Sequence, residues 1–414
     1  MKRIVLINND DRALSYGIGS YTENLIECLK KTGFAFDIAC LNADVHELKI
    51  VDHSRYREFF IPAFAGSNNK KIFSYSQMLP FLFKELFSAG DDLVFHFNYF
   101  YTDTFIAKLK TLFNCKVLLT VHYTEWSLIL NGDFRRLKSL SDKVKNGQTI
   151  SPSEKGLMNV VRTDKDIFRQ VDLILFVSQH TVKTYSALTI LKESKYTIVH
   201  NGLKDTYRKL SRRQKSAIRK RYHISEHETI LFFAGRLDRI KGIDGLIEAF
   251  QKVLRLKPEA HLFIAGEGDF LILLSKSRFA CTKITFLGFL CKSELYDFYN
   301  IADIGISCSI HEEFGLVALE MMMHKLPVIV TNTGGLAEIV DDGMNGLKVP
   351  IVYKKGKRTV DSKELARKII FLVENPGEGK RLGENARKKF LANYELSMFG
   401  TKMIQIYNSM NNNS

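Results

Sequence analysis

The sequence predicts an α/β protein made of two doubly wound domains, each with a parallel sheet. Short apolar runs alternate with helix-length amphipathic stretches through most of the chain, and this is the pattern of parallel strands covered by helices on both faces. The chain has 414 residues, which is too long for one ordinary core and suits two domains of about 200 residues each. Only 7 residues are Pro and 45% are hydrophobic, so a folded protein is expected rather than a disordered one.

The first half of the chain contains the first set of these elements. Buried strands are expected over residues 4–7, 36–41, 93–97, 116–121 and 173–177. Amphipathic stretches between them predict helices, among them residues 20–31 and 103–113. Because strand, helix and strand follow one another in this rhythm, the strands are expected to pair in parallel.

The pattern starts again after Asn201-Gly202. We therefore expect two Rossmann-like domains, over residues 1–196 and 197–396, that face each other across a cleft. A helix over about residues 397–414 is expected to pack back on the first domain. Ligands of such sheets lie outside the carboxyl ends of the strands. The strands of the second half are expected at residues 229–234, 261–265, 284–287, 304–308 and 327–331, with a helix at 243–256.

The charge and cysteine patterns exclude several classes of protein. Lys and Arg outnumber Asp and Glu by 60 to 45, but the most basic segment, 204–221, has the apolar spacing of a solvated helix. No nucleic-acid-binding motif accompanies it, so no nucleic acid partner is expected. The 6 Cys form no CxxC pair and are expected to be buried thiols in a reducing compartment. Without a signal peptide or an apolar span, we expect a cytoplasmic protein, either free or in peripheral contact with the membrane.

The segment 307–338 is the richest in candidate functional residues. Glu312 and Glu320 flank Phe314-Gly315-Leu316, where a helix is expected to begin near Gly315. The free N–H groups and the dipole of a helix start attract an anion, and Glu320, about one turn further along, can reach a polyol such as ribose. The alternative is that both glutamates are helix-capping or surface acids.

Three other sites carry candidate residues. Arg236 and Lys241 follow the strand at 229–234, and two cations at this edge of the sheet can hold a diphosphate, although surface cations are common in loops. Gly17 and Gly19 precede a helix and allow the backbone to approach a phosphate or sugar closely. His122 ends the strand at 117–121 and is either a satisfied core histidine or a residue that faces the cleft.

Taken together, these motifs resemble the retaining GT-B glycosyltransferases of family 4, over essentially the whole chain. The resemblance is carried in the second half by GRLxxxKG at 235–242, E-x7-E at 312–320, PVI at 327–329, GGxxE at 334–338 and Asn345-Gly346. More loosely, the first half matches at Gly17-Ile18-Gly19, Thr120-Val121-His122, Val177-Ser178 and His200-Asn201-Gly202.

The resemblance implies a role for each matching residue in the binding of a nucleotide-sugar donor. Arg236 and Lys241 would bind the diphosphate, and Glu320 the ribose. Glu312 and His122 would contact the transferred sugar. The phosphate side would be lined by Gly17 and Gly19 and by the backbone around Phe314, Gly315 and Leu316.

One residue departs from the family pattern. Glu313 stands where the family usually has Gly. A carboxylate beside the donor would repel a diphosphate unless its side chain pointed to solvent, so the geometry of this loop is left open by the sequence.

The chemistry of the site agrees with metal-independent sugar transfer. Breaking a sugar–phosphate bond builds positive charge on the sugar and negative charge on the departing diphosphate, which fixed cations and N–H dipoles stabilise. The DxD sequence at 164–166 is expected on a helix surface, so no metal or other cofactor is expected. Because no carboxylate is obviously placed as a nucleophile, we expect retention of configuration by departure and attack on one face.

Two alternatives to a transferase remain open from the sequence. One is an enzyme like the UDP-N-acetylglucosamine 2-epimerases, and the other is a non-catalytic GT-B subunit that binds a glycan or a partner protein. UDP is favoured as the donor nucleotide by its frequency in the family. The acceptor is a glycan, a lipid-linked molecule, a peptide or another molecule, and the aromatic-rich segment 59–113 either meets lipid or packs on the sheet.

Overall fold

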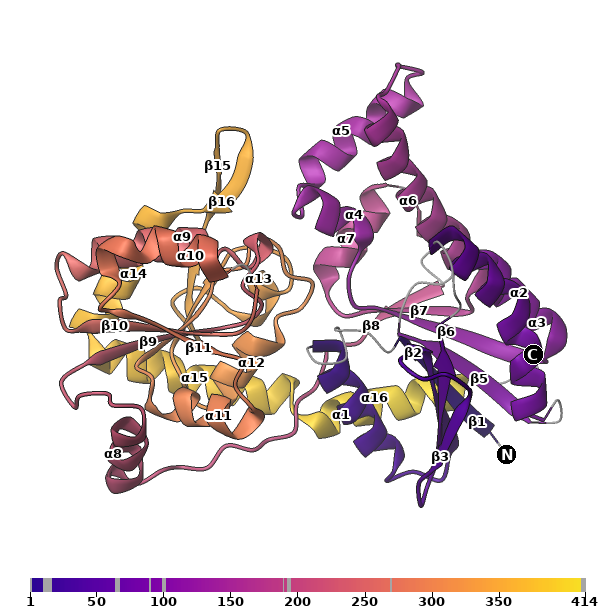
Figure 1. Cartoon of the computed structure of the whole chain (residues 1–414), viewed down its shortest axis with the longest axis horizontal. Coiled ribbons are helices and arrows are strands. Elements are labelled where there is room, and N and C mark those ends of the chain that lie inside the picture. The colour runs from indigo at the N-terminus through magenta and orange to yellow at the C-terminus, as the bar shows by residue number, and fades with distance from the viewer. Residues whose placement is uncertain are drawn as a thin grey trace. The chain divides into compact units, whose positions relative to one another are not determined.

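The computed structural model describes residues 2–9, 17–63, 68–88, 91–98, 102–188, 190–191, 195–268 and 270–410. The chain forms two compact units (Figure 1), in both of which a parallel sheet is covered by helices on its two faces. This confirms the predicted class. The first unit comprises Met1–Leu130, Phe134–Gly202 and Leu396–Ser414, and the second comprises Asn131–Asp133 and Leu203–Glu395.

The sheet of the first unit has the strand order β3-β4-β2-β1-β5-β6-β7-β8. Its strands are parallel except for β3, which pairs antiparallel with β4 at the edge. The five strands expected from apolar runs are all present, at β1, β2, β5, β6 and β7. The bounds are β1 Lys2–Asn9, β2 Ala35–Ala43, β3 Lys49–Asp52, β4 Arg57–Pro62, β5 Asp92–Phe97, β6 Cys115–Val121, β7 Leu173–Phe176 and β8 Tyr196–Ile198.

The alternation of side chains along each strand gives this sheet two cores. Val5 and Ile7 of β1 belong to the core beneath α2, α3 and α6, whereas Ile4 and Leu6 belong to the core beneath α1 and α16. Successive residues of a strand point to opposite faces, so a strand that is apolar throughout needs helices on both sides. The helices are α1 Gly17–Leu29, α2 Asn68–Leu86, α3 Asp103–Leu112, α4 Glu125–Leu130, α5 Phe134–Lys145, α6 Pro152–Gln170, α7 Gln179–Ala187 and α16 Leu396–Ser409.

The second unit contains a sheet with the order β11-β10-β9-β12-β13-β14 and an antiparallel hairpin, β15–β16. The strands are β9 Thr229–Ala234, β10 Ala260–Ala265, β11 Ile284–Gly288, β12 Ile304–Ser307, β13 Val328–Thr331, β14 Leu347–Val349, β15 Ile351–Lys354 and β16 Lys357–Val360. The α-helices are α8 Arg212–Arg221, α9 Ile243–Leu254, α10 Phe270–Ser277, α11 Lys292–Ile301, α12 Leu316–Met323, α13 Leu336–Ile339, α14 Ser362–Glu374 and α15 Pro376–Asn393. Two short 3-10 helices, η3 Arg239–Lys241 and η4 Arg278–Ala280, complete the second unit's elements.

The structure corrects several boundaries. A domain boundary after residue 196 would divide β8, which pairs with β7, and the first unit continues to Gly202. The basic segment 204–221 is helical only in α8, where Ser211 forms a capping box with Gln214. Of the cysteines, Cys281 and Cys291 are exposed rather than buried, because they lie outside the strands and helices that form the core.

Within the aromatic-rich segment 59–113, one face of α2 packs on the sheet. Phe83 and the adjacent Phe87 are buried, and both pack against Phe95 of β5. Met78 and Phe81 on another face of the helix are 57% and 53% exposed. Part of the aromatic excess therefore fills the core beneath α2 and α3.

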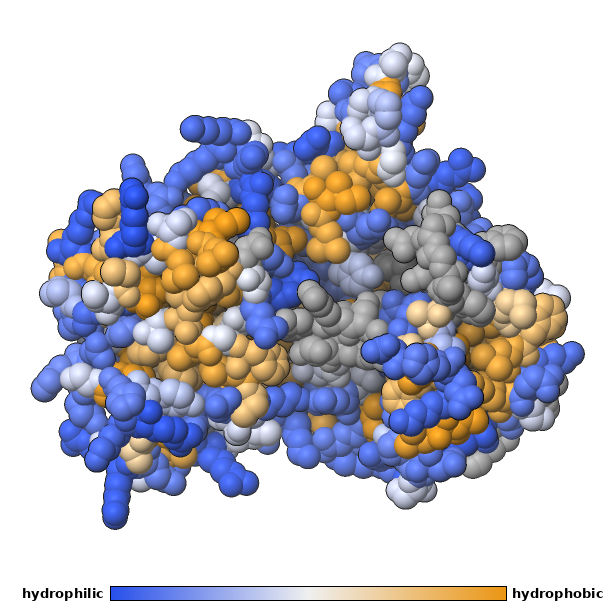
Figure 2. Space-filling view, in the orientation of Figure 1, coloured by the Kyte–Doolittle hydropathy of each residue, from blue (hydrophilic) through white to orange (hydrophobic). Residues whose placement is uncertain are grey.

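No helix in the described part of the chain is both long enough and apolar enough to cross a membrane. Apolar side chains nevertheless lie on the surface of the second unit, and part of this surface covers α10. They are orange in Figure 2. Leu271 and Ile272 are 80% and 55% exposed, and Phe279 of η4 is 78% exposed.

The structure places Asp164, from the DxD sequence, in the core instead of on the surface of α6. It is 5% exposed and accepts a hydrogen bond of 2.5 Å from the hydroxyl of Tyr185. Burial raises the pKa of the Asp164 carboxyl from 3.8 to about 7, although the bond from Tyr185 lowers the pKa. Below about pH 7 the native state therefore holds this carboxyl in its protonated form.

This raised pKa predicts a pH-dependent stability of the chain. Between the ordinary pKa of 3.8 and about 7, the unfolded chain holds fewer protons than the native one, so stability falls as the pH rises. Asp164→Asn keeps the acceptor for Tyr185 without the charge. At about pH 8 it should raise the free energy of unfolding by a few kcal/mol.

Urea unfolding of the wild type and the variant at several pH values tests this expectation. Asp166→Asn is the matched control, because Asp166 lies on the same helix but is partly exposed and pairs with Arg162 and Arg169. It should leave the pH dependence unchanged. Equal pH dependence in the wild type and Asp164→Asn would show that the buried carboxyl is not the cause.

Candidate active site

The candidate active site of the second unit lies in loops that leave neighbouring strands at the same edge of the sheet. β9 and β12 pair in parallel, and β12 pairs in parallel with β13. The loop after β9 contains Arg236 and Lys241, and the loop after β12 contains Glu312. A backbone hydrogen bond of 2.7 Å from Ile310 N to Ile240 O joins these two loops.

The Lys241 ammonium and the Glu312 carboxylate form the central contact of the site. Lys241 Nζ lies 2.6 Å from Glu312 Oε2, and both side chains are 21% exposed. Ser309 Oγ also donates to Glu312 Oε2, at 3.1 Å. Two donors thus hold this carboxylate at the carboxyl edge of the sheet, and the partial burial strengthens the ion pair relative to one in open solvent.

Arg236 has a different partner. Its Nη2 lies 3.0 Å from Asp238 Oδ2, and the Arg236 side chain is 46% exposed. The other oxygen of Asp238 accepts the backbone N–H of Lys241 and caps η3. The structure therefore brings Lys241 and Glu312 together but pairs Arg236 with Asp238, and an exposed arginine can exchange such a partner at small cost.

Two glycines are required where these loops approach each other. Gly242, which follows Lys241, has φ 71°, and a Cβ there would lie 2.0 Å from the carbonyl oxygen of Cys308. Gly334, in the loop after β13, has φ 51°, and a Cβ would lie 1.7 Å from the carbonyl oxygen of Glu312. Gly335 N donates to the same oxygen at 2.8 Å. The loop after β13 therefore supports the backbone of Glu312 and tolerates no larger side chain at Gly334.

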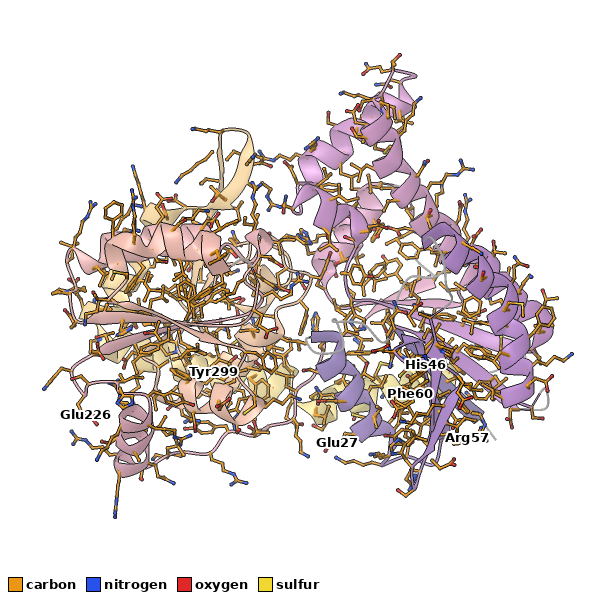
Figure 3. All side chains as sticks on the ribbon, viewed as in Figure 1. Glu27, His46, Arg57, Phe60, Glu226 and Tyr299 are labelled. Carbon is orange, nitrogen blue, oxygen red and sulfur yellow. The ribbon has the colours of Figure 1, made fainter. Side chains whose placement is uncertain are left out.

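Glu320 lies one turn inside α12, as the sequence predicts, and its partner is Tyr299. The Tyr299 hydroxyl donates to Glu320 Oε2 at 2.9 Å. Figure 3 labels Tyr299, which comes from α11 beneath the sheet of the second unit. Burial raises the pKa of the Glu320 carboxyl, against the opposing effect of this hydrogen bond. Tyr299 thus holds the carboxyl in one orientation.

Glu313, whose orientation the sequence left open, does not point to solvent. Its side chain is 7% exposed, and His311 Nε2 lies 3.0 Å from Glu313 Oε1. The His311 imidazole gives the buried Glu313 carboxylate the hydrogen-bond partner that it loses when it leaves water. The substitution of Glu for the usual Gly is accommodated by this buried pair.

The start of α12 has the geometry expected of a helix N-terminus. Gly315 is the N-cap with φ 112°, and Leu316 is the first residue of the helix. A Cβ at Gly315 would lie 2.6 Å from Leu336 Cδ2, so glycine is needed there. The ring of Phe314 is 5% exposed and packs edge-on against Tyr394. Only the backbone of Phe314 is therefore available for a ligand.

His122, Gly17 and Gly19 belong to the first unit. α1 begins at Gly17, three residues earlier than expected, so both glycines lie in its first turn. The imidazole of His122 packs edge-on against Tyr21, with ring centroids 4.3 Å apart. Its Nε2 is buried and has no hydrogen-bond partner among the residues described. Burial lowers the pKa of His122 to about 3, so the ring is neutral near pH 7.

Four residues that support the site were missed by sequence reasoning. Asp238 could have been found, because an Asp three residues before Lys241 has the spacing of an N-cap. Ser309, Tyr299 and His311 carry no such local signal, because their contacts depend on side-chain direction or on packing between distant segments. In the described part of the chain, no three His, Cys, Asp or Glu side chains gather closely enough to hold a metal ion.

Comparison with known proteins defines the class of this chain. The sequence model described as "Glycosyl transferases group 1" matches residues 214–389, and the one described as "Glycosyltransferase Family 4" matches residues 16–206. The sucrose-phosphate synthase of Thermosynechococcus elongatus has a similar fold, with a TM-score of 0.76 and 21% identity over 99% of this chain and 98% of that one. Anabaena HepE in complex with UDP and glucose aligns with a TM-score of 0.71 and 16% identity, over 99% and 100% of the two chains.

An uncharacterised glycosyltransferase of Methanocaldococcus jannaschii is 29% identical over 239 residues, or 56% of this chain and 59% of that protein. The chain spans about half the length of the curated relatives that it matches. The solved structures show that the chain has the GT-B fold. Because the two sequence models together cover most of the chain, it belongs to the glycosyltransferases of group 1 and family 4.

Proposed function

We propose that this protein transfers a sugar from a nucleotide diphosphate sugar to an acceptor, with retention of configuration and without a metal. The observation that carries the proposal is the ion pair of Lys241 and Glu312 in loops from adjacent strands. Both residues lie in the motifs that carry the family resemblance.

The departing diphosphate is stabilised by the cations of the loop after β9. In the absence of donor, Glu312 neutralises Lys241. When a diphosphate binds, the ammonium interacts with it, and Arg236 leaves Asp238 to add a second cation. Fixed positive charge at the point where negative charge develops lowers the barrier to bond cleavage. The backbone N–H groups at Gly315 and Leu316 add a third source of positive potential.

Glu312 acts on the sugar. As Lys241 turns to the diphosphate, the Glu312 carboxylate is held by Ser309 and is free to accept hydrogen bonds from sugar hydroxyl groups near the reacting carbon. Glu320 accepts the ribose hydroxyl groups. Attack on the face from which the diphosphate leaves gives retention, with the departing phosphate accepting the acceptor proton. The roles of His122, Gly17 and Gly19 toward the sugar and the phosphate stay predictions.

Two cations and the N-terminus of α12 stabilise the negative charge of the departing diphosphate, which a bound metal stabilises in other transferases. We therefore propose a metal-independent reaction. UDP is the proposed nucleotide, and the UDP complex of Anabaena HepE, which has a similar fold, supports this choice. The acceptor is proposed to be a glycan, a lipid-linked molecule or a peptide.

A panel of nucleotide diphosphate sugars tests the proposed function. A donor present at about one hundred times its dissociation constant should stabilise the protein by roughly 2.7 kcal/mol in a thermal shift. We expect a UDP-sugar to give this shift, and we expect its consumption to depend on an added acceptor. A shift with no member of the panel would contradict the proposal, and conversion of the donor without an acceptor would favour the epimerase alternative.

A further inference from the structure

A pocket with a strongly basic lining lies beside the proposed donor site, within the second unit. Its volume is about 370 Å³, which is within the size range of small-ligand pockets. Arg239 of η3 lines it together with Lys354, Lys357 and Arg358 of the hairpin β15–β16. The hairpin is largely blue in Figure 2. The other lining residues are Gly242, Asp244, Gly245, Ile310 and Thr359.

The positive charges of this pocket are not all neutralised by the protein. Its only acidic lining residue, Asp244, pairs with Lys276 at 2.7 Å. Lys354 pairs with Glu248 at 3.2 Å. Arg239 and Lys357 make no ion pair or side-chain hydrogen bond with any described residue. Like charges held close together destabilise a fold unless an anion neutralises them.

Arg358 forms one wall of the pocket in a fixed orientation. Its Nη1 donates to the carbonyl oxygens of Asn131 and Gly132, and its Nη2 donates to Thr333 Oγ1 at 3.3 Å. All of these partners belong to the second unit. These acceptors hold the planar guanidinium in one orientation at the pocket wall.

The hairpin that lines the pocket is held in place by packing against α9. Val360, at the end of β16, is fully buried and packs on the start of α9, where a Cβ at Gly245 would lie 2.8 Å from the Val360 Cβ. The pocket also adjoins the donor loops. Its lining residues Gly242 and Ile310 lie one residue from Lys241 and two residues from Glu312, respectively. The pocket is therefore close enough to the proposed donor site for one molecule to occupy both.

We propose that this pocket binds a phosphoryl group of the acceptor, so that the acceptor is a phosphorylated molecule. Arg239 and Lys357 make the charged contacts, and Arg358 contributes from the wall. The inference rests on the proposed function, because it assigns the acceptor of that reaction. Two sources fit the same chemistry, a soluble sugar phosphate and the phosphate of a lipid-linked acceptor.

The test uses the full chain with two of the four basic residues of the pocket neutralised, as Arg239→Gln/Lys357→Gln. These side chains are exposed, so the double variant should fold. The matched control is Lys355→Asn, which removes a lysine from the tip of the same hairpin outside the pocket lining. Asn is chosen because Lys355 has φ 49°, a conformation that Asn tolerates.

Binding is measured in two arms. Calorimetric titration with inorganic phosphate should show binding at least about tenfold weaker in the double variant than in the wild type, because two charge-assisted contacts are lost. The control should stay within about twofold of the wild type. Sedimentation with phosphatidylcholine vesicles, with and without phosphatidic acid, is the second arm. Loss in the first arm alone supports a soluble acceptor, and loss in both supports a lipid-linked one.

The proposal is overturned if the double variant and the wild type bind phosphate equally, if the control loses as much as the double variant, or if the wild type binds in neither arm. It is also overturned if the double variant binds the nucleotide-sugar donor tenfold more weakly, because the pocket would then belong to the donor site. The two proposals fail separately. Anion binding does not need transfer, and donor binding to the wild type can fail while the pocket still holds phosphate.

Discussion

Replacing Glu312 by Gln is expected to lower the turnover of sugar transfer about 10²- to 10³-fold, with a much smaller change in donor affinity. Glutamine has almost the same shape and can still accept from Ser309, so the loop should keep its structure. It lacks the charge that orients the sugar and stabilises the positive character of the ring in the transition state. Loss of one preorganised electrostatic group at a reacting centre costs this much in other enzymes.

Steady-state kinetics with purified donor and acceptor provide the measurement for Glu312→Gln. The matched control is Glu313→Gln, one residue further along. Glu313 is buried against His311, and glutamine can keep that hydrogen bond, so turnover should change only a few-fold if the variant is folded. A thermal melt checks the folding of both variants. If the two variants had equal turnover, Glu312 would have no special role.

Replacing Lys241 by Met should weaken donor binding about ten- to one-hundredfold. A hydrogen bond to a charged group contributes roughly 1.5–3 kcal/mol, and about 1.4 kcal/mol corresponds to a factor of ten in affinity. Methionine retains the length of the side chain but not the ammonium that would meet the diphosphate. Calorimetric titration with the donor measures the loss, and Lys355→Asn again serves as a control for the removal of one lysine.

The double variant Lys241→Met/Glu312→Gln separates the ion pair from the donor contacts. In the single variant Lys241→Met, the half-buried Glu312 carboxylate would lose its cation and would repel the diphosphate. Removing both charges should restore part of the donor affinity, because contacting residues are not additive. If Lys241→Met bound the donor as tightly as the wild type does, this lysine would not belong to the donor site.

The sequence predicted most of the interior strands and the edge strand β11, but it missed the interior strand β4 and the edge strands β3, β8 and β14. β1, β6, β9 and β12 are buried over most of their length, because helices cover both faces of each sheet. β3 is mostly exposed, and the hairpin β15–β16 is rich in lysine. A charged, exposed strand has no apolar run that distinguishes it from a loop.

The candidate site was predictable to the extent that its residues lie in local motifs. Lys241 and Glu312 follow neighbouring strands, so their motifs place them at one edge of the sheet. The partners of Glu320 and Glu313 were not predictable, because Tyr299 lies on a different helix and because the inward direction of Glu313 depends on the packing of His311. The basic pocket was missed for a related reason, since it needs the hairpin to fold against the start of α9.

Crystallographic analysis of the protein with a bound nucleotide diphosphate sugar would test the account most directly. The diphosphate oxygens are expected within hydrogen-bond distance of Lys241 Nζ and of the Arg236 guanidinium, with Glu312 Oε2 released from Lys241 and facing the sugar. A diphosphate bound elsewhere, with the 2.6 Å contact between Lys241 and Glu312 still intact, would contradict it.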